Sequence, residues 1–299
     1  MINKLMKKKY NIFITGGTGF LGSNLVNELS KNNRCKLFLL SRITSNFNRI
    51  DKKYLKKITI IKIENTKLDK IFKRYKFDSV IHCATNYGLK KKNISEVIQP
   101  NLILPMQLLD LAKNYKVKAF LNTDTVLNKN ISNYSLSKNH FSEWLKLFSE
   151  DFYCTNIKIE HFCGPKEDDS KFVISMIKSF LNKSKSIKLT KGSQKRDFIY
   201  IDDVVSAMKR ILFHALKQKK GFEIFEVGSG SNISIKNIII LIKKFCNNTT
   251  TKLEFGKLPM RKNELLHINL NLKKLFKLGW RPKYNLEVSL KKTIKYYNQ

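Results

Sequence analysis

The chain has 299 residues, enough for about two domains, and 42% of them are hydrophobic, which excludes a globally disordered protein. Lysine and arginine number 58 against 23 acidic residues, for a net charge of +35, but only eight are arginine and the lysines are spread along the chain. Because arginine is the residue that favours bidentate contacts with phosphates and bases, we expect no specific nucleic-acid partner.

No apolar run approaches the roughly 18 residues of a membrane-spanning helix. The basic N-terminus is not followed by a secretory cleavage site. We therefore expect no transmembrane segment and a cytoplasmic location. The five cysteines form no CxxC pair and no zinc-ligand spacing, so reduced structural thiols and no metal site are expected.

Short apolar runs alternate with helical patterns over the first 140 residues. Leucines at 21, 25 and 29 predict a helix over 20–31, and a second helix is expected over 102–115. Strands are expected at 11–15, 36–41, 58–63, 79–83 and 117–122. This alternation predicts an α/β fold with a Rossmann-type doubly wound parallel sheet, whose ligands bind beyond the carboxyl ends of the strands.

The second half of the chain is less regular. Phe141, Leu145 and Phe148 lie on one face of a helix that begins near residue 135. Further strands are expected at 156–159, 196–201 and 223–227, and further helices at 172–181 and 204–216. Asp202 and Asp203 are interpreted as an N-cap before the last of these helices. We expect a smaller mixed α/β region at the C-terminus.

A glycine-rich segment follows the first strand and opens the first helix. It reads Gly16-Gly17-Thr18-Gly19-Phe20-Leu21-Gly22. Gly16 allows the tight turn, Gly19 lets a pyrophosphate approach the backbone, and Gly22 permits close helix–strand packing. Backbone N–H groups at the helix N-terminus then face the phosphates. This segment predicts a dinucleotide site.

The end of the second strand indicates which dinucleotide is bound. NAD sites usually carry an acidic residue there, which binds the ribose 2′-hydroxyl. Here the strand ends in Ser41-Arg42, with no carboxylate. An arginine and a hydroxyl suit a 2′-phosphate, so NADP is the expected cofactor, with NAD as the alternative.

Tyr134 and Lys138 form a Y-x-x-x-K pattern on the helix that follows the fifth strand. Four positions apart, the two side chains share a face. A lysine ammonium close to the phenol is expected to lower its pKa, which makes the pair an acid–base group. Thr123 and Thr125 close the fifth strand and point to the same side. Either hydroxyl is a candidate to bind a substrate carbonyl oxygen beside Tyr134.

Together these motifs resemble the extended short-chain dehydrogenase/reductase family, the NAD-dependent epimerase/dehydratase group. The resemblance covers nearly the whole chain and is strongest for the 4-keto-6-deoxy sugar reductases, which include dTDP-fucose-forming reductases and CDP-abequose and CDP-paratose synthases. Besides GGTGFLG and YSLSK, it rests on the segments HCATNYG at 82–88, NTDTV at 122–126, KRDFIYIDDVV at 195–205 and LGWRP at 278–282.

The resemblance implies roles for further residues. It implies a dinucleotide-binding domain at 1–163, with 197–230 packing back on it, and a nucleotide-sugar region at 164–196 and 231–299. Cofactor contacts are implied for Phe20, Leu21, Glu64, Asn65, Ala84, Thr85, Asn101 and His161. Substrate contacts are implied for Asn86, Tyr87, Thr125, Arg196 and Arg261. His161 and Cys163 depart from the Asn and Tyr that many members carry there.

The resemblance leaves several activities open. A 4,6-dehydratase has a glutamate at the position of Thr125, so elimination of water is not expected. The absent acidic residue after the second strand favours an NADP-dependent 4-ketoreductase over a 4-epimerase with tightly bound NAD. A dinucleotide-binding regulator without turnover is the alternative of another class. The resemblance also implies a homodimer.

Overall fold

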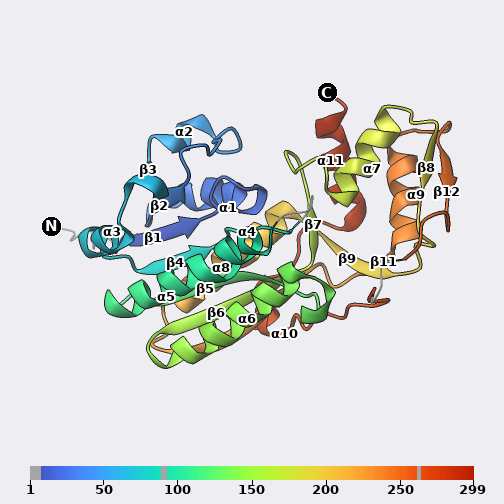
Figure 1. The fold of residues 1–299 in the computed structure, drawn as a ribbon. Coiled ribbons are helices and arrows are strands. Elements are labelled where there is room, and N and C mark those ends of the chain that lie inside the picture. The colour runs from blue at the N-terminus through green and yellow to red at the C-terminus, as the bar shows by residue number, and fades with distance from the viewer. Residues whose placement is uncertain (1–7, 89–92, 261–263) are drawn as a thin grey trace. The chain divides into compact units, whose positions relative to one another are not determined.

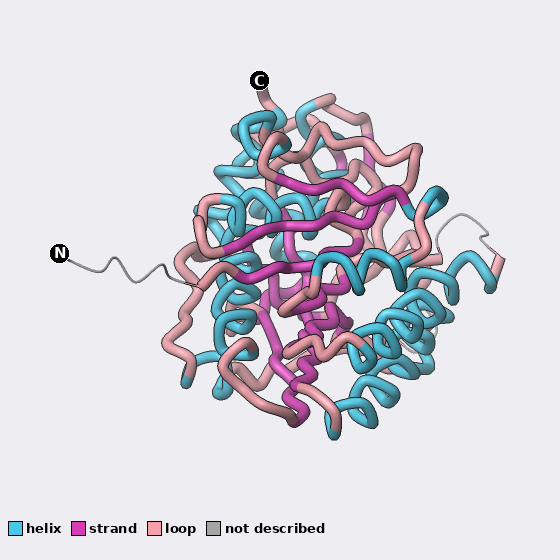
Figure 2. Tube along the Cα trace, turned by 90° about the vertical axis from the view of Figure 1, so that its left-hand side faces the viewer, coloured by secondary structure: helices cyan, strands magenta, loops and turns pink. Residues whose placement is uncertain are grey.

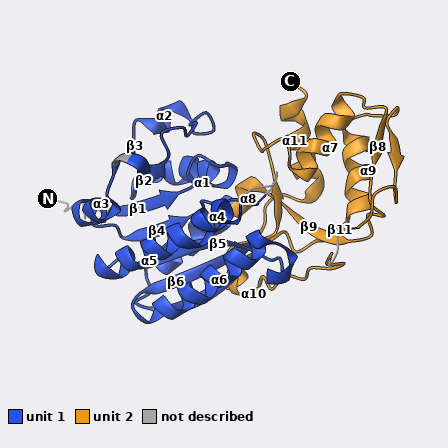
Figure 3. Ribbon diagram, viewed as in Figure 1, with its two compact units in different colours: residues 1–158, 205–225 blue, residues 159–204, 226–299 orange. Residues whose placement is uncertain are grey.

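The structure is a computed structural model that describes residues 8–88, 93–260 and 264–299. The chain divides into two compact units (Figure 3). The first unit comprises Met1–Lys158 and Val205–Phe225, and the second comprises Ile159–Val204 and Glu226–Gln299. Arg261, an implied substrate contact, lies outside the described residues.

A seven-stranded sheet in the order β10-β6-β5-β4-β1-β2-β3 forms the centre of the first unit (Figure 1). β1 pairs in parallel with both β2 and β4, and the pairs β2–β3 and β4–β5 are also parallel. The chain order reverses at β1, which is where open α/β sheets bind ligands. The predicted doubly wound sheet is confirmed. Its strands are β1 (Tyr10–Thr15), β2 (Cys35–Ser41), β3 (Ile58–Lys62), β4 (Ser79–His82), β5 (Ala119–Thr125), β6 (Tyr153–Ile159) and β10 (Gly221–Val227).

Helices lie on both sides of these strands (Figure 2). An aromatic core that includes Phe13, Phe72, Phe120 and Phe141 joins the sheet to α3, α5 and α6. Burial of such large side chains from both layers is the main stabilising contribution in a fold of this kind. The helices are α1 (Phe20–Ser30), α2 (Lys52–Leu55), α3 (Leu68–Tyr75), α4 (Ile94–Ile98), α5 (Leu104–Asn114), α6 (Asn133–Leu147) and α8 (Ile201–Ala215), with 3₁₀ turns η1 (Ile63–Asn65), η3 (Lys129–Ile131) and η4 (Phe148–Glu150).

Two helix boundaries differ from the predictions. The helix expected from residue 102 is preceded by a π-helical segment, η2 (Gln99–Ile103), where Pro100 has no N–H to donate. α8 begins at Ile201, so Asp202 and Asp203 lie in its first turn and the predicted N-cap is wrong. Asp203 instead accepts hydrogen bonds from the backbone N–H groups of Lys283 and Tyr284, at 2.9 and 3.0 Å.

The second unit has a core of its own. Three strands in the order β11-β9-β7 form one small sheet, and β12 and β8 form a parallel pair. Ile174, Phe198, Ile239 and Leu290 belong to one buried cluster, which joins the three-stranded sheet to three helices. The elements are β7 (His161–Cys163), α7 (Phe172–Leu181), β8 (Ser186–Lys188), β9 (Lys195–Tyr200), β11 (Asn232–Ser234), α9 (Ile235–Phe245), β12 (Lys252–Glu254), α10 (Lys273–Lys277) and α11 (Leu286–Tyr297).

Candidate active site

The glycine loop joins β1 to α1 and folds tightly against two backbone segments. Gly16 has φ of +66°, and a Cβ there would lie 2.5 Å from the backbone nitrogen of Ala84. A Cβ on Gly22 would overlap the carbonyl oxygen of Gly16. Gly19 is the N-cap of α1. Because it has no side chain, it cannot accept a hydrogen bond from the N–H groups of the first turn. The N-terminus of α1 therefore lies beyond the end of β1 with no side chain capping it.

The loop after β2 contains the residues expected to select the cofactor. Ser41 is buried, and its hydroxyl has no hydrogen-bond partner among the described residues. Arg42 is exposed. Both carboxylate oxygens of Glu64 lie 3.1 Å from the N–H of Ile43, so the structure brings an acidic side chain to this loop from the end of β3. Asn65 belongs to η1, but its side chain lies outside the described part of the chain.

His82 connects three elements of the first unit; the sequence placed it in a family segment but gave it no role. Its Nε2 lies 3.0 Å from the carbonyl oxygen of Pro100, and its Nδ1 lies 2.8 Å from the hydroxyl of Thr15. Because a carbonyl can only accept, Nε2 carries the proton. Burial, with the charge of Lys138 as a smaller cause, holds the pKa of His82 well below its usual range. A neutral imidazole therefore ties β1 and β4 to η2.

Asn101 holds the loop that follows β4. Its Oδ1 accepts hydrogen bonds from the hydroxyl of Thr85 and the N–H of Asn86, both at 3.0 Å. Its Nδ2 donates to the carbonyl oxygen of Asn86 at 2.9 Å and to the hydroxyl of Ser137 at 3.1 Å. The amide thus fixes this loop to α6, and a direct contact between Asn101 and a cofactor stays a prediction.

α6 carries the Tyr134 and Lys138 pair. The helix starts at a capping box, in which the hydroxyl of Ser132 accepts from the N–H of Ser135 and Ser135 returns a bond to Ser132. Lys138 is 1% exposed, and its Nζ has no hydrogen-bond partner among the described residues. Burial lowers the pKa of Lys138, and the charge of Asp124 opposes that shift. A buried ammonium with three unused donors requires a partner, which a ligand can supply.

Tyr134 lies in a group of hydroxyls. Those of Thr125 and Thr85 interact with its phenol and favour the charged form. The ring of Tyr87 lies 4.9 Å from that of Tyr134, between centroids. Burial raises the pKa of Tyr134 far above its usual range, and Tyr87 and Asp124 add to this. The predicted lowering of the Tyr134 pKa is therefore wrong, because loss of hydration is the largest influence on it and raises it. The phenol is protonated at neutral pH.

The structure separates the two threonines that the sequence left as alternatives. The hydroxyl of Thr123 donates to the carbonyl oxygen of His82 at 3.0 Å and is buried between β5 and β4. The hydroxyl of Thr125 accepts from the N–H of Leu127 at 3.2 Å and faces Tyr134. Of the two hydroxyls, that of Thr125 is therefore the one that interacts with the Tyr134 phenol.

In the second unit, two of the predicted basic residues are each bound to a carboxylate. The guanidinium of buried Arg196 forms an ion pair with Glu264 and donates to the carbonyl oxygen of Lys195 at 2.7 Å. The Nδ1 of His161 lies 3.1 Å from buried Glu160. β7 and β9 are parallel, with His161 opposite Phe198. Because side chains alternate along a strand, His161 and Arg196 lie on one face of the small sheet.

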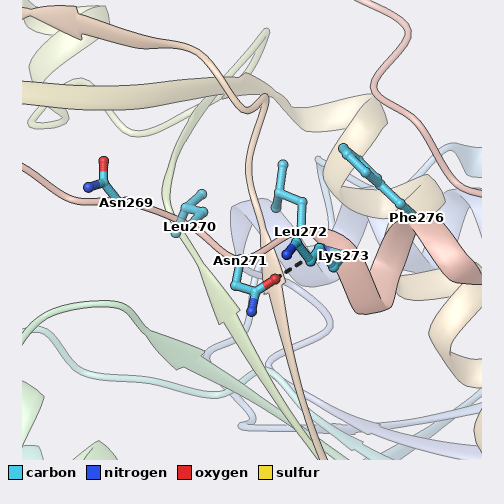
Figure 4. Close-up of a pocket in the computed structure, with 6 residues that line it drawn as sticks. All are labelled: Asn269, Leu270, Asn271, Leu272, Lys273 and Phe276. Atoms are coloured by element: carbon cyan, nitrogen blue, oxygen red, sulfur yellow. Dashed lines mark hydrogen bonds between the residues drawn. The ribbon is translucent and has the colours of Figure 1, made fainter.

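A separate hollow of about 460 Å³ occurs in the second unit (Figure 4). None of its lining residues was predicted to belong to a site. They are Asn269, Leu270, Asn271, Leu272, Lys273 and Phe276. Within the described ranges, no cluster of three metal-ligating side chains and no helix able to cross a membrane is found. All five cysteines are free thiols, as predicted.

Comparison with known proteins identifies the class of this chain. Residues 12–228 match the model of the NAD dependent epimerase/dehydratase family, a span that includes both the glycine loop and the Tyr134–Lys138 pair. The chain belongs to this family. The membership and the enzyme class that the sequence predicted are thereby confirmed.

Individual members of the family resemble the chain over nearly its whole length. It is 32% identical over 296 residues to CDP-abequose synthase of Salmonella muenchen, covering 95% of this chain and 96% of the relative. It is 29% identical over 324 residues to dTDP-4-dehydro-6-deoxyglucose reductase of Escherichia coli, covering 96% and 98%. UDP-glucose 4-epimerase of Thermotoga maritima, solved with UDP-glucose, has the same fold, with a TM-score of 0.83, 22% identity and coverage of 96% and 98%.

The residues of the first unit fit a dinucleotide. The glycine loop leaves no room for a Cβ at Gly16 or Gly22, and its helix N-terminus offers donors suited to a diphosphate. The ammonium of Lys138 and the hydroxyl of Ser41 have no partner in the described part of the chain. The first suits the hydroxyls of a ribose, and the second lies at the end of β2. These polar groups lie at or beyond the carboxyl ends of the strands, as the sheet topology predicts.

Proposed function

We propose that the protein reduces a nucleotide-linked 4-keto-6-deoxy sugar at C4 with NADPH. The observation that carries this proposal is the state of Tyr134, a protonated phenol held beside the hydroxyl of Thr125 and one helical turn from the ammonium of Lys138. Such a phenol is a proton donor. The resemblance to a 4-dehydro sugar reductase and to CDP-abequose synthase supports the substrate class.

The proposed roles follow from the contacts of each side chain. The carbonyl oxygen of the sugar accepts hydrogen bonds from Thr125 and Tyr134, and Tyr134 gives up its proton as negative charge develops on that oxygen. The nicotinamide, when bound, supplies the hydride that adds to C4. The nearby positive charge of Lys138 stabilises the phenolate that results, and Lys138 holds the ribose hydroxyls.

The remaining predicted residues are assigned to substrate and cofactor as the sequence motifs suggest. Asn86 and Tyr87 follow β4 and lie on the Tyr134 side of the site, where Tyr87 contacts the phenol ring. We assign them, with Arg196 and Arg261, to the substrate. Ala84, Thr85 and the glycine loop are assigned to the cofactor, and His161 is kept as a predicted cofactor contact. Guanidinium groups are well matched to a diphosphate because they donate in a planar fork.

The experiment that tests this function measures the oxidation of NADPH by the purified protein in the presence of CDP- and dTDP-linked 4-keto-6-deoxy sugars. The expected result is a stoichiometric loss of NADPH absorbance with formation of the 6-deoxy sugar nucleotide. Mass spectrometry of the product identifies the reduced carbon. Absence of turnover with both nucleotides, under conditions where NADPH binds, would overturn the proposal.

A 4-epimerase is the second candidate, because the fold matches that of UDP-glucose 4-epimerase with a TM-score of 0.83. Glu64, which lies against the loop after β2, supplies a carboxylate near the place where NAD sites carry one. The two functions differ in their retained ligand. Mass spectrometry of the purified protein would reveal tightly held NAD for an epimerase and readily exchanged NADP for a reductase.

A further inference from the structure

A third polar side chain lies on the face of α6 that carries Tyr134 and Lys138. Tyr134, Lys138 and Ser142 are spaced four residues apart, so their side chains follow one another along the helix. The hydroxyl of Ser142 accepts a hydrogen bond from the Nδ2 of Asn156 at 2.8 Å. Asn156 lies on β6 and is fully buried. The helix that carries the proposed proton donor is therefore fixed to the sheet by a polar contact two turns below Tyr134.

Asn156 also contacts Asp124, at the end of β5. Its Nδ2 also donates to Oδ2 of Asp124 at 2.6 Å, and its Oδ1 accepts from Nδ2 of Asn122 at 2.7 Å. The other oxygen of Asp124 accepts from the N–H of Thr125 at 2.7 Å. Both carboxylate oxygens are thus occupied by protein donors, and one of those donors is the backbone of the threonine that faces Tyr134.

Asp124 is also a buried negative charge that acts electrostatically on a buried positive one. It is 6% exposed and Lys138 is 1% exposed, and each shifts the pKa of the other toward the charged form. Among the described residues, His82 and Cys83 at the end of β4 also interact with Lys138, and Lys158 on β6 acts on Asp124. The imidazole is neutral, and burial raises the pKa of Cys83 to about 12, which leaves it a thiol. Among the described groups that interact with Lys138, only Asp124 carries a charge at neutral pH.

We propose that Asp124 is a positioning residue for the reaction. Its carboxylate, held by Asn156, fixes Thr125 beside the phenol and supplies the counter-charge that keeps the Lys138 ammonium inside the site. Asp124 is buried and both of its oxygens accept from protein donors, so we assign it no contact with the substrate. The expected effect of Asp124 on turnover rests on the proposed function. Its expected effect on the protonation of Lys138 does not, because that depends only on contacts within this chain.

The first experiment compares Asp124→Asn with a matched control, Asp203→Asn. Asp203 is likewise buried and accepts two backbone N–H groups, but it lies in the second unit. Unfolding midpoints of the ligand-free proteins are measured from about pH 7 to about pH 10, the range below the ordinary lysine pKa. Without its counter-charge Lys138 releases its proton at lower pH, and the buried charge is then removed.

The sign of the effect follows from linkage. A lysine whose folded pKa is lowered binds fewer protons in the folded than in the unfolded protein, so stability rises with pH in that window. The deficit of Asp124→Asn relative to wild type is therefore expected to shrink as the pH rises, while the deficit of Asp203→Asn stays constant. In a Lys138→Met background the pH dependence caused by Asp124→Asn should disappear. Parallel deficits for the two single variants would overturn the counter-charge role.

The second experiment is a swap. The double variant Asp124→Asn, Asn156→Asp exchanges the carboxylate and the amide between two residues that are hydrogen-bonded to each other. Each acceptor keeps a donor. Asp124→Asn alone should lower kcat about 10²-fold with little change in KM, because a displaced catalytic group loses alignment. The double variant should recover part of that loss. Equal activity of wild type and Asp124→Asn would overturn the positioning role. If wild type has no activity but the stability deficit of Asp124→Asn still shrinks as the pH rises, only the proposed function is overturned.

Discussion

Arg196 on β9 forms an ion pair with Glu264, which lies 68 positions later in the chain. Only 5% of the Arg196 side chain is exposed, and its other guanidinium nitrogen donates to the carbonyl oxygen of Lys195. The two contacts hold the guanidinium in one orientation before any substrate is bound. A preoriented cation binds an anionic ligand with a smaller loss of side-chain entropy.

Replacing Glu264 with glutamine should therefore weaken substrate binding. Ordering a freed arginine costs about 0.5–1.5 kcal/mol, so KM for the nucleotide sugar should rise about two- to tenfold while kcat changes less. Steady-state kinetics measure both constants. The control is Asp169→Asn, which removes the exposed partner of Lys178 and should leave KM unchanged. An unchanged KM in Glu264→Gln would contradict the role of the ion pair.

Tyr134→Phe removes the proposed proton donor and keeps the ring. General-acid assistance contributes about 10²–10⁴-fold, so kcat should fall by that factor while NADPH binding, measured by fluorescence, is nearly retained. Tyr115→Phe is the matched control, since it removes an exposed hydroxyl that donates to Asp69 and has no assigned role in the reaction. Because the pKa of Tyr134 is raised, its ionisation should not limit activity near neutral pH. Full turnover in Tyr134→Phe would exclude it as the donor.

Gly22→Ala should disrupt the first turn of α1. The added methyl group would overlap the carbonyl oxygen of Gly16, so the glycine loop must move to accept it. The expected result is a lower unfolding midpoint together with loss of NADPH binding. At Gly279, φ is +75° but a Cβ would meet nothing within 4 Å. Gly279→Ala should therefore cost only about 1 kcal/mol and leave NADPH binding intact. Wild-type affinity in Gly22→Ala would argue against a phosphate at this loop.

Arg42→Ala tests the predicted preference for NADP. Loss of a hydrogen bond to a charged group costs about 1.5–3 kcal/mol, so NADPH affinity should fall about tenfold or more while NADH affinity stays the same. Arg74→Ala removes a different cation, one that stacks on Tyr75 in α3, and should change neither. Titration of both nucleotides by fluorescence gives the ratio. If Arg42→Ala weakens NADPH and NADH equally, Arg42 does not read the 2′-phosphate.

The cysteines should react with a thiol reagent in two classes. Burial raises the pKa of Cys35 and of Cys246 to about 11 and that of Cys83 to about 12, so near pH 8 almost no thiolate is present. Half-buried Cys35 and Cys246 should react slowly in the native protein. The buried thiols of Cys83, Cys154 and Cys163 should react only after unfolding in guanidinium. Rapid reaction of a buried thiol, mapped by mass spectrometry, would contradict this burial.

Several features of the protein could be predicted from local sequence. Apolar runs and four-residue repeats predicted the strands and helices of the first unit, because burial imposes a period on each element. The glycine loop and the Tyr134–Lys138 pair could be found because their function depends on spacing within one turn or one helix. Local patterns did not predict the π-helical segment η2. There Pro100 alters the hydrogen bonding of a sequence that otherwise has the pattern of one helix.

The rest depended on contacts between distant segments. Thr123 and Thr125 are equivalent in the sequence, and only the position of β4 commits the first to His82 and leaves the second beside Tyr134. The pairings of Asp124 with Asn156 and of Arg196 with Glu264 likewise join residues far apart in the chain. Protonation states also depended on tertiary structure. The sequence placed a lysine one helical turn from a tyrosine, but burial set their pKa values. The cost of removing a group from water depends on everything that packs around it.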